Sequence, residues 1–195
     1  MAMQCALVIP VRSFADAKTR LASTLNPTQR EELMRNCVSR VIAAGQNTTY
    51  IQEIVLVSAD KHVKHFAQLA SVNFFSSDVS LNEDLNACVY GLNLSLDGII
   101  ISHGDLPWIT TFDDVHEYLL HHQIVIAPDR HRKGTNIYAH NREVSAQYEF
   151  GADSLSKHIR NIRATRMSYT LIQSPEYGLD IDTPHDHKFV NEKGQ

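Results

Sequence analysis

The sequence contains few cysteines, and none is placed to form a disulfide framework or a zinc site. Cys5, Cys37 and Cys88 are odd in number, widely spaced and outside any CxxC pattern. This usage excludes a secreted disulfide scaffold and a zinc knuckle as interpretations. Reduced thiols fit a reducing compartment, so we expect the protein in the cytoplasm.

Long apolar runs, an export signal and an excess of positive charge are also missing. No apolar stretch approaches the roughly 20 residues that a bilayer span requires. The first residues lead directly into an apolar segment, without the basic and small-residue signals of a secretory leader. The formal net charge is −4, whereas binding to duplex nucleic acid or a membrane surface is favoured by a basic face. We therefore expect neither nucleic acid nor membrane as a partner.

What the sequence does contain is a regular alternation of short β-type runs and helical patterns. The chain has 195 residues, 43% of them hydrophobic, which suits one core but is short for two, so we expect a single domain over residues 1–195. Seven runs have the composition of strands: Cys5–Val11, Glu53–Ala59, Val72–Phe75, Gly98–Ser102, Gln123–Pro128, Thr135–His140 and Met167–Ile172. Most are separated by segments with apolar residues at helical spacing. The alternation predicts a three-layer α/β fold around a mixed, mainly parallel sheet.

The last third of the chain departs from simple alternation. Two strand-like runs are joined by a polar turn, and a long helical pattern follows Gly151. We expect an antiparallel or mixed extension of the sheet here. In contrast, Gly98–Ile101 is apolar at consecutive positions, which is typical of a central parallel strand covered on both faces.

Three basic side chains follow the first predicted strand. Arg12, Lys18 and Arg20 lie in a segment that leaves the carboxyl end of that strand, and open α/β sheets bind ligands at that edge. Guanidinium and ammonium groups are strong donors to a triphosphate. A solvated loop is the ordinary alternative, because neither GxGxxG nor GxxxxGK[ST] is present.

Carboxylates follow two other predicted strands. Asp105 comes after a buried strand, and Gly104 beside it allows a close backbone approach. Asp180 and Asp182 lie two positions apart and project to one side if the strand continues through them. Mg²⁺ is commonly held by one or two carboxylates plus substrate phosphates, so either could share a metal with Asp105. Alternatively, Asp182 caps the helix that begins at Thr183-Pro184.

A possible anion site begins at Gly151. Gly151 and Ser154 open the long helix, whose first backbone N–H groups favour an anion, and Thr135 on a facing strand would add a hydroxyl. An ordinary N-cap at Asp153 or Ser154 is the simpler alternative.

The eleven histidines do not predict a metal site. His62 and His65 are spaced for a polar helix face, and no HExxH or Cys/His ligand set is present. Cys88 lies in an apolar helical pattern, which favours a buried, inert thiol.

Six motifs in order resemble the CofC family, the phospholactate guanylyltransferases: IPVRSFADAKTRLAS, SLNEDLNACVYGLN, SHGDLPWIT, IAPDRHRKGTNIYAH, FGADSLSKHI and GLDIDTP. The resemblance extends from Ile9 to about Pro184. It implies a variant of the nucleotidyltransferase fold related to the molybdenum-cofactor guanylyltransferases and GT-A glycosyltransferases, usually a homodimer.

The resemblance also implies roles for individual residues. Three would be catalytic, namely Lys18, Arg20 and Asp105. GTP would be bound by Arg12, Lys18, Arg20 and Asn86, and Mg²⁺ by Asp105 and Asp182. The acceptor's phosphate and carboxylate would be bound by Thr135, Gly151 and Ser154.

The implied reaction transfers GMP from GTP to the phosphate of a three-carbon phospho-acid, with release of pyrophosphate, in coenzyme F420 biosynthesis. The acceptor would be 2-phospho-L-lactate, phosphoenolpyruvate or 3-phospho-D-glycerate, and the motifs do not decide among them. Two alternatives stay open. One is a nucleotidyltransferase for a molybdopterin or a sugar phosphate, and the other is a nucleotide-binding module without catalysis.

Overall fold

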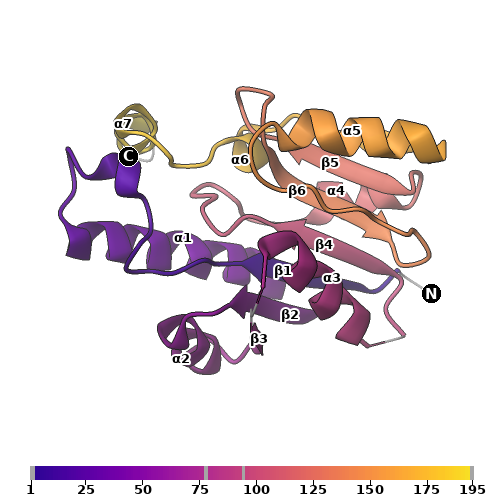
Figure 1. Cartoon of the computed structure of the whole chain (residues 1–195), viewed down its shortest axis with the longest axis horizontal. Coiled ribbons are helices and arrows are strands. Elements are labelled where there is room, and N and C mark those ends of the chain that lie inside the picture. The colour runs from indigo at the N-terminus through magenta and orange to yellow at the C-terminus, as the bar shows by residue number, and fades with distance from the viewer. Residues whose placement is uncertain (1–2, 77–78, 94, 194–195) are drawn as a thin grey trace.

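A computed structural model describes residues 3–76, 79–93 and 95–193 (Figure 1). Its seven-stranded sheet has the order β3-β2-β1-β4-β6-β5-β7. The strands are β1 (Cys5–Pro10), β2 (Ile51–Ser58), β3 (Asn73–Ser76), β4 (Gly98–Ser102), β5 (Ile124–Pro128), β6 (Thr135–Asn141) and β7 (Tyr169–Leu171). Each strand overlaps one of the seven predicted runs, so the strand predictions are confirmed.

The sheet is mixed, and β6 is the strand that reverses direction. β3, β2, β1 and β4 pair in parallel, β6 runs antiparallel to both β4 and β5, and β7 is parallel to β5. The reversal follows from the chain, because only residues 129–134 join β5 to β6, which is too short for a parallel crossover. The predicted mixed extension is therefore confirmed.

The longest helix begins where the sequence offers a cap. Asn26 caps the longest helix, α1: its side chain accepts from the N–H of Gln29 while the Gln29 side chain accepts from the N–H of Asn26. The helices are α1 (Pro27–Gln46), α2 (Lys61–Leu69), α3 (Leu81–Gly91), α4 (Asp113–Leu119), α5 (Ser154–Thr165), α6 (Pro175–Gly178) and α7 (Pro184–Lys193), with a 3₁₀ turn η1 (Thr19–Leu21).

Helices cover both faces of the sheet, as Figure 1 shows. Along β1, Leu7 and Ile9 face one core, which also contains residues of α1, α2 and α4. Ala6 and Val8 face a second core with residues of α3 and α5. Alternate side chains of a strand point to opposite faces, so a strand buried on both sides is apolar throughout. The three-layer prediction is confirmed.

The C-terminal helix α7 lies apart from the sheet, beside the segment that carries η1 (Figure 1). Val190 of α7 packs against a small cluster that contains Leu21 of η1, Cys37 of α1 and Ile181. This cluster fixes the segment before α7 against the segment after β1. Two stretches far apart in the sequence therefore meet at one edge of the sheet.

Within the three described ranges, no helix is both long and apolar enough to cross a bilayer.

Candidate active site

The candidate active site lies where β1 and β4 end. These strands are parallel neighbours, with Val8 opposite Ile101, so the segments that leave them emerge at the same edge of the sheet. The segment after β1 carries Lys18, and the segment after β4 carries Asp105. The two side chains form an ion pair.

A third segment, between α6 and α7, completes an acidic cluster of Asp105, Asp180 and Asp182. One carboxylate oxygen from each residue lies within 4.8 Å of the others. Lys18 Nζ lies 3.0 Å from Asp182 Oδ1. The predicted residues Lys18, Asp105 and Asp182 are thus brought together, and Asp180 joins them.

Lys18 reaches the cluster because of an unusual backbone conformation. Its φ is 54° and its ψ 39°, in the left-handed region, which costs a non-glycine residue roughly 1 kcal/mol or more. The turn is held by the Leu21 N–H, which donates to the Lys18 carbonyl at 2.9 Å, and Leu21 itself is fully buried. The Lys18 side chain is only 6% exposed. Burial opposes its charge, but attraction to Asp105 and then Asp182 raises the pKa of Lys18 above its usual value.

Asp105 is held close to α1 by the glycine before it. A Cβ on Gly104 would meet Val38 Cγ2 at 3.0 Å, so the predicted close approach is confirmed. The His103 N–H also donates to the Asn136 carbonyl at 2.8 Å, which ties this segment to β6. Burial favours the neutral acid, but Lys18 outweighs it and lowers the pKa of Asp105.

Asp180 differs from Asp105 in the direction in which its pKa is shifted. Burial, followed by repulsion from Asp105 and Asp182, raises the pKa of Asp180 to about 7. Like charges at this separation disfavour simultaneous ionisation. A divalent cation among the three residues would favour the ionised form.

Asp182 does not cap α7. The N–H of Thr183 donates to Asp186 Oδ2 at 2.7 Å, and the N–H of Asp186 donates to Thr183 Oγ1 at 3.3 Å. Thr183 and Asp186 therefore form the reciprocal cap. The structure therefore excludes the alternative in which Asp182 caps this helix. Its carboxylate instead accepts hydrogen bonds from Lys18 and, at 3.4 Å, from Arg20.

The acidic cluster fits a magnesium ion. Within the described part of the chain, Asp105 Oδ1 is buried and has no hydrogen-bond partner, although buried carboxylate oxygens normally have one. The cluster already pairs with two cations, the buried Lys18 ammonium and the exposed Arg20 guanidinium. Carboxylate oxygens are the ligands that Mg²⁺ takes in proteins. Asp105 with Asp182, and with Asp180 beside them, would hold the ion.

Two adjoining cavities open beside this cluster. The first, which we call the charged chamber, has a volume of about 230 Å³ and is lined by Arg12, Lys18, Arg20, Asp105 and Asp182. The second, the apolar chamber, has a volume of about 410 Å³, and its apolar lining comprises Pro10, Val11, Met34, Val57, Val79 and Leu81. Arg12, Met34 and Asp105 line both chambers. Together they can accept a long ligand with one highly charged and one flat, apolar part.

Asn86 is the predicted nucleotide-binding residue that the structure places apart from these chambers. It is exposed on α3, and its Nδ2 donates to the Asn82 carbonyl one turn earlier at 2.9 Å. It is not among the residues that line either chamber. A role for Asn86 stays a prediction.

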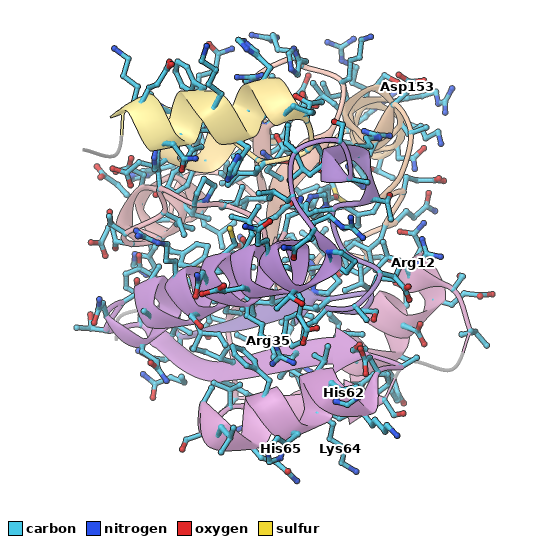
Figure 2. The ribbon with its side chains drawn as sticks, turned by 90° about the vertical axis from the view of Figure 1, so that its left-hand side faces the viewer. Arg12, Arg35, His62, Lys64, His65 and Asp153 are labelled. Carbon is cyan, nitrogen blue, oxygen red and sulfur yellow. The ribbon has the colours of Figure 1, made fainter. Side chains whose placement is uncertain are left out.

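Two of the predicted acceptor residues, Gly151 and Ser154, lie at the start of α5, and Thr135 bonds to His158 of the same helix. Thr135 at the start of β6 is fully buried and Ser154 is 2% exposed, whereas Gly151 is exposed with a φ of 126°. Asp153 next to them shares one flank of the molecule with Arg12 (Figure 2). Asp153 is the N-cap residue of α5, but its side chain makes no capping hydrogen bond. The binding of an acceptor here stays a prediction.

His158 of α5 connects the elements that carry these three residues. Its Nε2 accepts from the Glu149 N–H at 2.9 Å, and its Nδ1 lies 3.0 Å from Thr135 Oγ1. A neutral imidazole has one N–H, so Nδ1 carries the proton and donates to Thr135. Burial first, then the charges of His103 and Lys157, lower the pKa of His158 to about 4. The ring therefore stays neutral and joins β6, α5 and the segment before Gly151.

His62 and His65 lie on an exposed helix face and Cys88 is buried, as their sequence patterns predicted. His62 and His65 are exposed on α2 and point away from the body of the protein (Figure 2). The described part of the chain contains one group of three potential metal ligands, and it includes no histidine. Cys88 is buried, and burial raises the pKa of its thiol to about 12.

Three residues of this region were not predicted. Asp84 is a buried carboxylate that lines the apolar chamber. His158 joins β6 to α5 through Thr135, and Asp186 pairs with Arg130 while capping α7. The T-x-x-D spacing of Thr183 and Asp186 was a readable capping signal. Asp84 and His158 lie at inward positions of amphipathic helices, and such a position alone does not distinguish a buried polar residue.

Comparisons with known proteins agree on fold and chemistry. The family model described as "Guanylyl transferase CofC like" matches residues 5–193. The chain is similar to a phosphoenolpyruvate guanylyltransferase of Sphaerobacter thermophilus, with 32% identity over 92% of this chain and 88% of that protein. It is also similar to a 2-phospho-L-lactate guanylyltransferase of Methanosphaera stadtmanae, with 25% identity over 92% and 80%. A 4-diphosphocytidyl-2C-methyl-D-erythritol synthase structure from Anaerococcus prevotii matches with a TM-score of 0.66 at 11% identity, covering 98% of both chains, which shows the fold alone.

Proposed function

The chain belongs to the CofC-like guanylyl transferase family, and from that premise we propose that it transfers GMP from GTP to the phosphate of a three-carbon phospho-acid. The acceptor in this proposal is phosphoenolpyruvate, 2-phospho-L-lactate or 3-phospho-D-glycerate. The reaction releases pyrophosphate and belongs to coenzyme F420 biosynthesis.

One observation carries the proposal. Lys18, Asp105 and Asp182 meet at the wall of the charged chamber, and an apolar chamber adjoins it. A nucleoside triphosphate has the matching distribution, with a flat base at one end and about four negative charges at the other. The basic side chains and the acidic cluster suit the triphosphate and its metal.

The mechanism needs no protein nucleophile. The acceptor's phosphate, with a second pKa of about 6, is largely ionised at pH 7, and one of its oxygens attacks the α-phosphorus of GTP. The bond from the α-phosphorus to the bridging oxygen breaks, and pyrophosphate leaves with that electron pair. Lys18, Arg12 and Arg20 orient the triphosphate and offset the charge that develops on it. Mg²⁺, when bound by Asp105 and Asp182, neutralises phosphate charge in the same place.

The acceptor would be held at the start of α5. Gly151 and Ser154 lie where the helix presents backbone N–H groups, and an acid with both a carboxylate and a phosphate offers two anionic ends. The first relative described above acts on phosphoenolpyruvate and the second on 2-phospho-L-lactate. These acids differ by one double bond, so the acceptor pocket must discriminate by shape.

Pyrophosphate release tests the proposal. The protein is supplied with GTP, MgCl₂ and each of the three acids in turn, with ATP as the control nucleotide. We expect release with GTP and one preferred acid. The proposal would be contradicted if only ATP supported pyrophosphate release. It would also be contradicted if none of the three acids led to release from GTP.

The wider setting is part of the same proposal. We take Mg²⁺ as the metal because the acidic cluster consists of oxygen ligands only. The family resemblance supports a homodimer, a single domain and a cytoplasmic location. Sedimentation equilibrium tests the dimer, and chelation with EDTA followed by Mg²⁺ addition tests the metal.

A further inference from the structure

The segment that leads into Gly151 is held by side chains and not by the sheet. Glu149 and Phe150 lie outside the helices and strands. The Glu149 N–H donates to His158 Nε2 at 2.9 Å, and the Phe150 N–H donates to Asn82 Oδ1 at 2.9 Å. Asn82 Nδ2 in turn donates to the Phe150 carbonyl oxygen at 3.3 Å. One amide side chain therefore satisfies both backbone polar groups of Phe150.

Asn82 reaches this segment from a helix that borders the apolar chamber. It lies in the first turn of α3, next to Leu81, which lines that chamber. Its orientation follows from its partners, because a backbone N–H can only donate and a carbonyl oxygen can only accept. Oδ1 must therefore face the Phe150 N–H, and Nδ2 must face the Phe150 carbonyl. Asn82 has no role in the mechanism above.

The bond to the Phe150 carbonyl fixes the direction of the next N–H. The Phe150 carbonyl and the Gly151 N–H belong to one planar, trans peptide group and point in opposite directions. Gly151 is exposed, and its N–H makes no hydrogen bond within the described part of the chain. A free backbone donor is therefore held in a set direction just before α5.

We propose that Asn82 is a positioning residue that aims the Gly151 N–H at an anionic group of the acceptor. A backbone N–H that donates to a carboxylate or phosphate oxygen forms a charge-assisted hydrogen bond, which is stronger than a neutral one. The nearby start of α5 at Ser154 adds a favourable field for an anion. The inference rests on the proposed function, because it assumes that the phospho-acid binds at Gly151.

Packing of the Phe150 ring does not by itself set the orientation of this peptide group. The ring centroid lies 5.6 Å from that of His103 and 5.1 Å from that of His158, and Phe150 is 7% exposed. These contacts hold the ring, whereas the peptide can still rotate about the dihedrals on either side of it. Glycine allows a wide range of φ. The hydrogen bond from Asn82 is the contact that restricts this rotation.

Asn82→Ala tests the proposal because it removes both hydrogen bonds to Phe150. We expect the KM for the preferred phospho-acid to rise about 10-fold and the KM for GTP to stay near its wild-type value. Asn26→Ala is the matched control, since it removes the side chain that accepts from the Gln29 N–H and caps α1. It should lower stability and leave both KM values unchanged. An unchanged acceptor KM in folded Asn82→Ala, or an equal rise in both KM values, would overturn the proposal.

A double variant tests whether Asn82 acts through Gly151. If it does, adding Asn82→Ala to Gly151→Ala should change the acceptor KM by less than about 2-fold, because the aim of the N–H is already lost. An acceptor KM equal to the product of the two single effects would place the action of Asn82 elsewhere and overturn the proposal. No pyrophosphate release by the wild type with any of the three acids would refute the proposed function, and this inference with it.

Discussion

Lys18 and Asp182 are 164 positions apart in the sequence, yet Lys18 Nζ lies 3.0 Å from Asp182 Oδ1. Lys18 also pairs with Asp105, so one ammonium offsets two carboxylates. It is the buried cation of the acidic cluster, whereas Arg20, which lies 3.4 Å from Asp182, is exposed. The loop proposed to bind phosphate and the site proposed to hold the metal are therefore joined by ion pairs.

This coupling predicts that Lys18→Met is destabilised and that Mg²⁺ restores part of the loss. Removing one partner of a buried ion pair costs about 3 kcal/mol, or roughly 6–12 °C in Tm for a chain of this size. Thermal unfolding with and without MgCl₂ measures both effects. Lys188→Met is the control, because Lys188 pairs with Glu192 at 3.7 Å and its side chain is 75% exposed. Equal Tm values for the two variants would refute the coupling.

Asp105→Asn should remove turnover and leave the fold intact. The substitution keeps side-chain volume and removes the charge of a proposed metal ligand, so we expect kcat to fall by at least ~100-fold. Asp114→Asn, on the exposed surface of α4, should keep its turnover. Circular dichroism checks the fold of both variants. Near wild-type turnover in folded Asp105→Asn would remove Asp105 from the metal site.

The conformation of Gly151 predicts a selective defect in acceptor binding. No atom lies within 4 Å of an added Cβ, but the φ of 126° is strained for any L side chain, at a cost of about 1–3 kcal/mol. Gly151→Ala should therefore raise the KM for the phospho-acid and leave the KM for GTP near its wild-type value. Gly91→Ala is the matched control, since it too has open space around the Cβ but no positive φ. An equal rise in the KM for GTP and the KM for the phospho-acid would show that Gly151 is not part of the acceptor site.

Two buried histidines predict a loss of stability in mild acid. Burial lowers the pKa of His140 and of His158 to about 4, whereas unfolded histidine has a pKa of about 6.5. Below that value the unfolded chain binds protons that the native protein does not. Their stabilisation is thus complete above pH 6.5 and is lost as the pH falls toward 4, by up to about 1.4 kcal/mol per pH unit for each ring.

Urea unfolding of wild type and His158→Asn at pH 4.5, 5.5 and 6.5 measures this dependence. The free energy of unfolding of the variant should change less steeply with pH, by the equivalent of one bound proton. The comparison isolates His158, because Asp180, whose raised pKa acts in the opposite direction, is common to both proteins. His62→Asn, at an exposed position, should keep the wild-type slope. An unchanged slope in His158→Asn would mean that this ring is charged in the native protein.

The sheet was predictable from the sequence because its signals are local. Consecutive apolar residues predict a strand such as β4. The cap at Asn26 and the helical spacing of apolar residues predict α1. Short elements such as α6, with four residues, give too little periodicity to detect.

The site was predictable only in part, because its geometry depends on long-range packing. Spacing placed Lys18 and Asp105 at strand ends, but their pairing depends on a left-handed backbone at Lys18 and a close approach at Gly104. Asp180 looked equivalent to Asp182 in the sequence, which does not show the burial that raises the pKa of Asp180. Burial of Asp84 likewise arises from how α3 packs and is not visible in its sequence neighbours.

The most direct test of guanylyl transfer is to identify the product by ³¹P NMR. The protein is incubated with GTP, MgCl₂ and the preferred phospho-acid. The account predicts two coupled diphosphodiester resonances, one from the phosphorus of GMP and one from the acceptor's phosphate, together with free pyrophosphate. GDP and inorganic phosphate in their place, with the acceptor's resonance unchanged, would show hydrolysis and contradict the central claim.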